Sequence, residues 1–345
     1  MPLVSTGRTT MRTTLTMLAA TTAIALAAPA FAQDFVMKIS SPVPPTTNDV
    51  VYAWMTAFEQ GVEEATDGAI DVQLFPANQL GQIPATVEGV AMGTIEMTIP
   101  VIGFLAALEP RFAAMDAAGL FESEEHAMRT FSDPALRELL ATFGEAANVE
   151  PLMMMTSGQA VVIAQEPIEQ VADFQGLVMR TGGTTPLLNR PLEALGVTPV
   201  AIPLGEVLPS MQTGQIDASS ANMAVLNAFQ FQDVATEATY LPGNFTIIGG
   251  LISRDFLAMI GPENEAIVRQ EAAEALSAFE GYVQNGPAAL EAMWEGNGGT
   301  IRHLAEDQAE AYFSTVRPVI EAVVADDPQM EEAYRILVEA ADRNR

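Results

Sequence analysis

The chain has no cysteine among its 345 residues. It can therefore form no disulfide bond, and it has no thiol for catalysis or for metal binding. A chain of this length must then be held together by burial of apolar side chains alone, and 49% of its residues are hydrophobic. The length exceeds that of one ordinary domain, so we expect two domains.

Positive charge is scarce. Lys and Arg number 15 against 44 Asp and Glu, which gives a formal net charge of −29, and Lys38 is the only lysine. Such a charge repels a phosphate backbone, which excludes nucleic acid as a partner. It also opposes long-range attraction of any anionic ligand. An acid that binds this protein must therefore be captured by local groups.

The residue patterns of catalysis are missing as well. The two histidines, His126 and His303, lie far apart, and each falls in a polar segment predicted to be helical. A metal site needs clustered ligands, a hydrolase triad needs a positioned base, and no nucleotide-binding glycine motif is present. We therefore expect no catalytic residue, no metal and no cofactor. Asp217 or Glu206 could serve as the acid of an exported hydrolase, but no base or oxyanion donor accompanies either of them.

The first segment predicts export. Arg8 and Arg12 precede an apolar stretch over residues 15–28, and Ala30-Phe31-Ala32 supplies the small residues of a cleavage site. This pattern is typical of a secretory signal peptide cut after Ala32, which predicts that the mature protein is exported. An uncleaved membrane anchor is the alternative, but it requires roughly 20 apolar residues. No later segment is long and apolar enough to span a bilayer.

The remaining chain alternates strands with helices, which predicts an α/β fold built on βαβ units. The predicted strands of the first part cover residues 35–40, 70–75 and 95–99, with a helix that Asn48 or Asp49 caps and a second helix over 84–92. In the middle part, strands are predicted over 149–155, 159–164, 177–180 and 199–202.

Two sheet systems are therefore expected, with the chain passing between them near Thr156 and Asn244. The C-terminal part is predicted to be helical from Glu263 onward, with an interruption at residues 285–287. We interpret the pair at 124–125, both glutamates, as solvated charges on a helix.

Arg180 is the first candidate for holding an anion. It ends the apolar run 176–179 and precedes the Gly-rich turn 181–185, in a chain where positive charge is rare. Ligands of open α/β sheets bind at the carboxyl ends of the strands, which is the position that Arg180 occupies in the predicted sheet. The alternative is a surface arginine that pairs with one of the many carboxylates.

Several motifs carry a family resemblance. The segments LFPANQLG at 74–81 and VAMGTIEM at 90–97 resemble two motifs of the substrate-binding proteins of tripartite ATP-independent periplasmic (TRAP) transporters. In the second half, DFQGLVMR at 173–180 and the run from Leu195 to Asp217 are similar to further motifs of that family. The resemblance covers essentially all of residues 34–300.

The resemblance implies a two-lobed periplasmic binding protein fold, with a ligand cleft between the lobes and a shared hinge. Residues 33–156 and 245–284 would form lobe I. Residues 157–244 and 285–345 would form lobe II and the C-terminal helices. The implied function is capture of an organic acid and its delivery to the TRAP membrane subunits, and we expect a monomer. A binding protein of an ATP-driven importer or of a sensor system is the alternative, because lobe closure is the same physical event there.

The resemblance also implies site residues. Arg180 matches the arginine that clamps the ligand carboxylate, and a guanidinium can give two parallel hydrogen bonds to such a group. Gln159 matches a glutamine used by members that bind oxo and hydroxy acids. Asn222 matches an asparagine of other members, although it could equally be a helix cap. Ser41, Leu204 and Phe245 would line the cleft walls. Some members of the family bind a cation together with the ligand, through an acidic and an aromatic residue. This chain has the segment 219–222, Ser-Ser-Ala-Asn, in that region, so the resemblance does not extend to a cation site, and whether a cation accompanies the ligand stays open.

Overall fold

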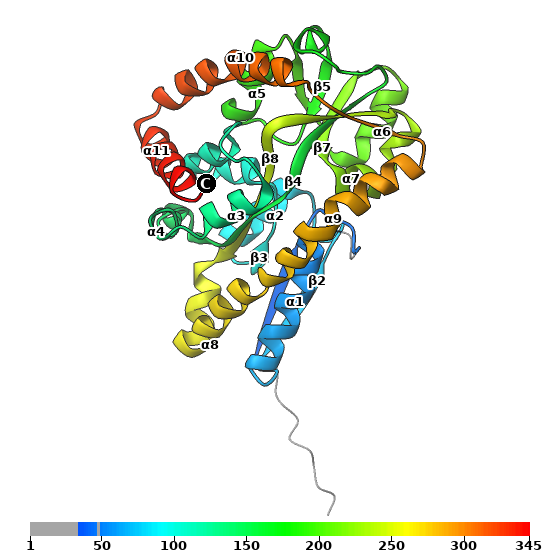
Figure 1. The fold of residues 1–345 in the computed structure, drawn as a ribbon. Helices are drawn as coiled ribbons and strands as arrows, with labels where there is room; N and C mark the ends of the chain where they lie inside the picture. Colours follow the sequence, from blue (N-terminus) through cyan, green and yellow to red (C-terminus); the bar gives the residue numbers. More distant parts are fainter. Residues whose placement is uncertain (1–33, 47–48) are drawn as a thin grey trace, which may run out of the picture.

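The computed structural model describes residues 34–46 and 49–345 (Figure 1). The predicted signal peptide lies outside these residues. None of the helices that the structure describes combines the length and the apolar composition needed to cross a membrane.

The described strands form one nine-stranded sheet in the order β2-β1-β3-β8-β4-β7-β5-β6, with β9 paired to β8. The strands are β1 (Phe35–Ser40), β2 (Ile70–Phe75), β3 (Met97–Thr98), β4 (Val149–Ala164), β5 (Val178–Thr181), β6 (Thr198–Ala201), β7 (Ala218–Asn222), β8 (Glu237–Ser253) and β9 (Thr300–His303). The predicted α/β alternation is confirmed, and the two expected sheet systems join into one hydrogen-bonded sheet.

The first half of the sheet consists of β1, β2 and β3, which run parallel. Helix α1 (Val50–Ala65) covers it because its apolar residues recur at the helical period, and Trp54 and Phe58 are both buried and stacked on each other. Asp49 caps this helix by accepting hydrogen bonds from the first-turn N–H groups, as one of the two predicted caps. Helix α2 (Ile83–Ala91) follows β2.

Two long antiparallel strands, β4 and β8, connect the halves of the sheet (Figure 1). The sequence predicted two strands over 149–155 and 159–164, but β4 is continuous across Ser157-Gly158. A register shift between Thr156 and Gln159 absorbs these residues, and Gly158 adopts a φ of 118°, which side-chain-bearing residues rarely adopt. The break that the sequence suggested is therefore an irregularity within one strand. We call the segment 156–159 the crossing.

The second half of the sheet consists of β5, β6 and β7, which run parallel. Its helices are α5 (Pro186–Ala194), α6 (Leu204–Gln212) and α7 (Met223–Ala228). Between the halves, the chain forms the 3₁₀ helices η1 (Ile102–Ala107), η2 (Pro110–Asp116) and η3 (Glu145–Ala147) and the helices α3 (Glu124–Phe131) and α4 (Pro134–Leu140). Two more short 3₁₀ helices, η4 (Val171–Phe174) and η5 (Phe231–Asp233), precede β5 and β8.

Three apolar cores hold these elements. One lies between the first half of the sheet and α1, and includes Trp54 and Phe58. A second lies under α6, α7 and α9 and includes Trp294. The third is continuous from Phe112 through Leu187 to residues of the C-terminal helices. Each half of the sheet thus has an apolar core of its own, and the third core contains residues from segments of both halves.

The C-terminal helices are α8 (Arg254–Glu274), α9 (Ser277–Gly296), α10 (Glu306–Ala325) and α11 (Pro328–Arg343). The predicted interruption at 285–287 is wrong, because α9 continues through it; a proline inside a helix costs stability without always ending it. A residue with non-helical backbone angles lies instead within α8, at Gly261, directly before Pro262. Helix α9 contacts both α1 and α7, and so extends along both halves.

Helix α10 packs on α5, whereas α11 packs on α3, α4 and η2. The C-terminal pair therefore contacts segments that were expected in different lobes, and the residue ranges of the lobes stay a prediction.

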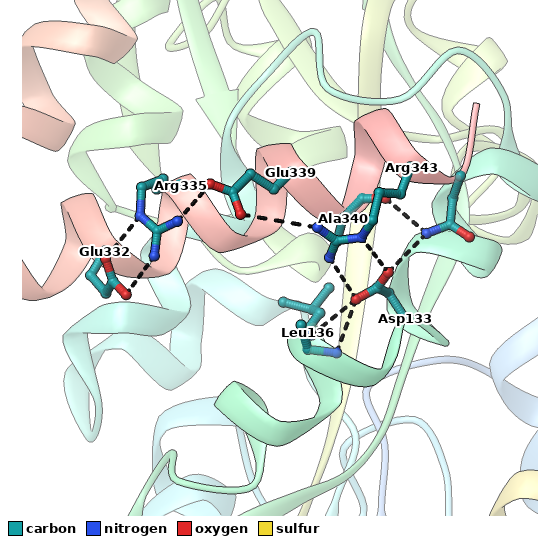
Figure 2. A network of polar contacts seen from close by, with 9 residues as sticks. Asp133, Leu136, Glu332, Arg335, Glu339, Ala340 and Arg343 are labelled. Atoms are coloured by element: carbon teal, nitrogen blue, oxygen red, sulfur yellow. Dashed lines mark hydrogen bonds and ion pairs between the residues drawn. The ribbon is translucent and has the colours of Figure 1, made fainter.

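Helix α11 is attached through Asp133, as Figure 2 shows. This carboxylate accepts the N–H groups of Ala135 and Leu136 as the cap of α4, and accepts hydrogen bonds from the Arg343 guanidinium at 2.9 and 3.1 Å. His126 adds a second link, because its Nε2 lies 2.8 Å from the Ala341 carbonyl oxygen. His126 lies in a helix, as expected, and is buried where α3 meets α11. The helix expected at His303 is wrong, because this residue ends strand β9.

Candidate functional site

Both sets of parallel strands end toward the crossing, from opposite sides. In the first half, β3 runs along β8 toward the crossing, and Val101 just beyond it bridges to Ile248. In the second half, β7 runs along β4 from Ala164 toward Ala160. Because β1 and β2 are parallel to β3, and β5 and β6 are parallel to β7, the carboxyl ends of six strands face each other across this region. This is the edge where α/β sheets bind ligands.

Arg180 lies at that edge, one residue before the end of β5. Its side chain is buried, with 6% of the residue exposed. The guanidinium Nε donates to the carbonyl oxygen of Ile202, just after β6, and Nη1 donates to the carbonyl oxygen of Ser220 in β7, both at 3.1 Å. The two neighbouring strands therefore fix the plane and direction of the guanidinium.

No carboxylate of the described residues lies within ion-pair distance of Arg180. The alternative interpretation, a surface arginine paired with a carboxylate, is thus wrong for this conformation. Burial lowers the pKa of Arg180 to about 10, so the group still carries its charge at neutral pH. A buried charge without a counter-ion is costly, and an anionic ligand would remove that cost.

The turn after Arg180 is held by its own polar groups. The Thr181 hydroxyl donates to the carbonyl oxygen of Gly183 at 2.9 Å. A Cβ at Gly182 would lie 4.0 Å from Arg180 Nη1, which is an ordinary van der Waals distance, so this turn passes close to the guanidinium. Thr185 then caps α5.

Gln159 and Asn222 lie on the neighbouring strands β4 and β7. Gln159 Nε2 donates to the Leu241 carbonyl oxygen at 2.8 Å, and the side chain lines a cavity of about 110 Å³ beside the crossing. Asn222 Nδ2 donates to Ser157 Oγ at 2.8 Å, and its Oδ1 accepts from the N–H of Val225 at 2.9 Å. The cap interpretation of Asn222 is confirmed, since it is the N-cap of α7.

The three predicted wall residues occupy different places. Leu204 begins α6, two residues after the carbonyl that anchors Arg180. Phe245 is paired with Gln159 in the β4–β8 ladder. Ser41 follows β1 and is buried, and its backbone bonds to Phe75 and Asn78. The structure thus groups Arg180 with Leu204, and Gln159 with Asn222 and Phe245, while Ser41 belongs to the opposite set of strand ends.

Comparisons with known proteins identify the family of this chain. Residues 41–327 match the DctP family model, described as bacterial extracellular solute-binding protein, family 7. The chain belongs to this family.

Among curated relatives, the C4-dicarboxylate-binding periplasmic protein DctP of Rhodobacter capsulatus is 25% identical over 298 residues, covering 86% of this chain and 88% of that protein. The ectoine-binding periplasmic protein TeaA of Halomonas elongata is 28% identical over 66% of each chain. A TRAP periplasmic solute-binding protein from Desulfovibrio salexigens with bound orotic acid has a similar fold, with a TM-score of 0.84 and 19% identity over 90% of this chain and 99% of that chain. The expected fold, two lobes with a cleft and a shared hinge, is thereby confirmed.

Two features of this DctP-family protein were missed from the sequence. Glu124 is not a solvated charge: its Oε2 is buried beside the cavity that Gln159 lines and has no hydrogen-bond partner among the described residues. Burial, and secondarily the charge of Glu125, raise the pKa of Glu124 to about 7. The sequence feature that indicates this burial is the apolar pair Ala127 and Met128. These residues follow Glu124 by three and four positions and therefore lie on the same face of the helix.

The second missed feature is Asp116, which lies beside the turn after Arg180 and accepts a hydrogen bond from Thr185. Burial raises the pKa of Asp116 to about 6, against the lowering effect of the Thr185 hydroxyl. No local pattern identified it, because its partner is 69 residues away in the sequence.

Proposed function

We propose that this protein captures an organic acid between the two sets of strand ends, with Arg180 holding the carboxylate, and delivers it to the membrane subunits of a TRAP transporter. The observation that carries the proposal is the guanidinium of Arg180, which is buried at the carboxyl ends of the strands without a carboxylate partner among the described residues. The family match supports the transport role.

The donor geometry suits a carboxylate. An arginine has five N–H donors. Hydrogen bonds within the described part of the chain use the Nε–H and one N–H of Nη1, both on backbone carbonyls. The other N–H groups can then bind a carboxylate in a direction that the protein has already fixed, which lowers the entropy cost of binding.

The ligands named for similar proteins are mostly acids. They include galacturonate for a protein from Xanthobacter autotrophicus, galactonate for one from Advenella mimigardefordensis and orotic acid for the Desulfovibrio salexigens protein. Each carries a carboxylate, which supports an acid here and leaves the rest of the molecule open. Gln159, Asn222, Leu204, Phe245 and Ser41 are proposed as the polar and apolar surroundings of that acid.

The remaining features belong to the same proposal. The protein binds without chemical turnover, uses no cofactor and acts as a monomer. It works in the periplasm after cleavage behind Ala32. Its lobes have the ranges given above. The family consists of solute-binding proteins, which supports the absence of turnover.

A thermal-shift screen tests the proposal. The panel contains galacturonate, galactonate, orotate, a C4 dicarboxylate and ectoine. A bound acid at about 100 times its Kd should add about 2.7 kcal/mol of stability. The shift should be absent in Arg180→Ala. Mass spectrometry of the recovered acid should show it unchanged. A panel acid that stabilises the parent protein and Arg180→Ala equally would contradict the proposed role of Arg180.

A further inference from the structure

Asp116 and Thr185 join two segments that are distant in the sequence. Asp116 is the last residue of η2, and Thr185 is the N-cap of α5. The Thr185 hydroxyl donates to Asp116 Oδ2 at 2.8 Å and accepts from the N–H of Leu188 at 3.3 Å. A threonine hydroxyl has a single proton to donate, and here it goes to Asp116.

Gly103 leaves the space that this hydrogen bond needs. A Cβ at position 103 would lie 2.8 Å from Asp116 Oδ2 and 3.4 Å from the Thr185 methyl carbon Cγ2. The first distance is shorter than a carbon–oxygen contact allows, so any side chain at this position would displace the carboxylate. On the other side, a Cβ at Gly183 would lie 4.0 Å from the Cα of Gly103. The backbones of the two segments are therefore packed directly against each other.

These segments belong to the opposite walls of the candidate site. Gly103 is in η1, which follows the end of β3 and the bridge of Val101 to β8. Gly183 and Thr185 follow Arg180 at the end of β5. The contact therefore connects the wall that carries Arg180 to the wall formed by the first half of the sheet.

We infer that the hydrogen bond from Thr185 to Asp116 is a closure contact, which forms when the two walls come together over the bound acid and which positions the turn after Arg180. The inference rests on the proposed function. A contact present only in the closed form shifts the equilibrium toward that form, and the apparent affinity rises with the closed fraction. Asp116 is thus a positioning residue that sets how slowly the acid leaves.

Binding kinetics with three variants test the inference. Asp116→Ala removes the acceptor, and Gly103→Ala displaces it. Thr185→Ser is the matched control, because it keeps the hydroxyl. The probe is the panel acid that stabilises the parent protein most. Asp116→Ala and Gly103→Ala should each weaken binding about tenfold, mainly through faster dissociation, and Thr185→Ser should bind within about threefold of the parent.

A second measurement needs no ligand. Since the chain has no cysteine, Met92→Cys and Arg190→Cys can carry a fluorophore pair, and both parent side chains are largely exposed. Single-molecule energy transfer should show a smaller closed fraction in Asp116→Ala than in the parent.

The outcomes separate the two proposals. Equal affinities and equal closed fractions in Asp116→Ala and the parent would overturn the closure contact, even if melting temperatures differ. Binding of a panel acid that survives Arg180→Ala would overturn the proposed role of Arg180 while the energy-transfer result still decides the role of Asp116.

Discussion

At the scale of single residues, charge and burial decide the interpretation. Arg180 and Asp133 both have a charged side chain, but their partners differ. Asp133 is matched by the guanidinium of Arg343. Arg180 has only backbone carbonyls as partners among the described residues. A matched pair stabilises the fold, whereas an unmatched buried cation favours binding of an anion.

Replacement of Arg180 should therefore affect binding strongly. Arg180→Ala leaves a desolvated ligand carboxylate unpaired, which costs roughly 3–5 kcal/mol. Affinity should fall by about two to three orders of magnitude or more. Arg180→Lys should recover only part of it, because an ammonium lacks the forked donors of a guanidinium. Calorimetry measures the three affinities.

Arg335→Ala is the control for this series, since that side chain is half exposed and pairs with Glu332 and Glu339 on the surface of α11. It should bind as the parent does. An Arg180→Ala protein that is folded by circular dichroism and binds within about threefold of the parent would rule out the carboxylate clamp.

At the scale of elements, the continuity of β4 through the crossing depends on Gly158. Its φ of 118° is strained for any residue with a Cβ, although the nearest atoms would lie at 3.6 and 3.8 Å and leave room for one. Gly158→Ala should therefore lower the free energy of unfolding by roughly 1–3 kcal/mol through backbone strain alone. Chemical denaturation measures this value.

Gly205→Ala is the matched control, because this exposed glycine lies in α6, and no atom of the described part of the chain lies within 4 Å of the new Cβ. The change should be neutral or stabilising by up to about 1 kcal/mol, since alanine favours the helix. A Gly158→Ala protein as stable as Gly205→Ala would show that the crossing adopts another backbone conformation.

The attachment of α11 should depend on pH. Hydrogen bonds from Arg343, followed by the backbone N–H groups of Leu136 and Ala135, hold the pKa of Asp133 at about 2, below its ordinary 3.8. A lowered carboxylate pKa stabilises the fold above 3.8, and this contribution is lost as the pH falls toward about 2. Arg343→Gln should therefore lower the melting temperature at neutral pH, and the difference from the parent should shrink as the pH falls from 4 toward about 2.

Arg335→Gln lies on the same helix and removes only exposed ion pairs, so its effect at neutral pH should be smaller. Equal effects of the two variants would show that the Asp133 contact does not hold α11.

At the scale of the whole molecule, several buried carboxyl groups make the fold less stable at neutral pH than at mildly acidic pH. Burial raises the pKa of Asp49 to about 6, of Asp116 to about 6 and of Glu124 to about 7. A carboxyl group whose pKa is higher in the folded state binds more protons there, so stability increases as the pH falls through the folded pKa. The net charge of −29 adds to this direction, because protonation reduces self-repulsion.

Thermal melts should therefore show stability rising from about pH 8 to about pH 5, and falling again below about pH 4 as carboxylates with lowered pKa values, such as Asp133, are protonated. Asp49→Asn keeps a good helix cap but removes one titrating group, so the rise should be smaller in this variant. A melting temperature that increases steadily from pH 5 to 8 would contradict these pKa directions.

Local patterns in the amino-acid sequence were enough to predict several helices and strands and to single out Arg180. Periodicity and capping patterns are local, so β1, β2 and α1 with its cap Asp49 followed directly from it. Arg180 could be singled out because cations are rare and because a strand end followed by glycines is a local signal. The family motifs supplied the two-lobed fold in the same way.

Features that depend on contacts between distant segments could not be predicted in this way. Whether Arg180 is paired, whether Glu124 is solvated and whether His126 is buried are set by residues that come together only when the sheet and the C-terminal helices assemble. The same holds for β4, which stays one strand because β8 pairs with it on both sides of the crossing. Asp116 meets Thr185 only because Gly103 allows close packing. Burial and hydrogen bonding between segments are properties of the assembled chain, and no local pattern contains them.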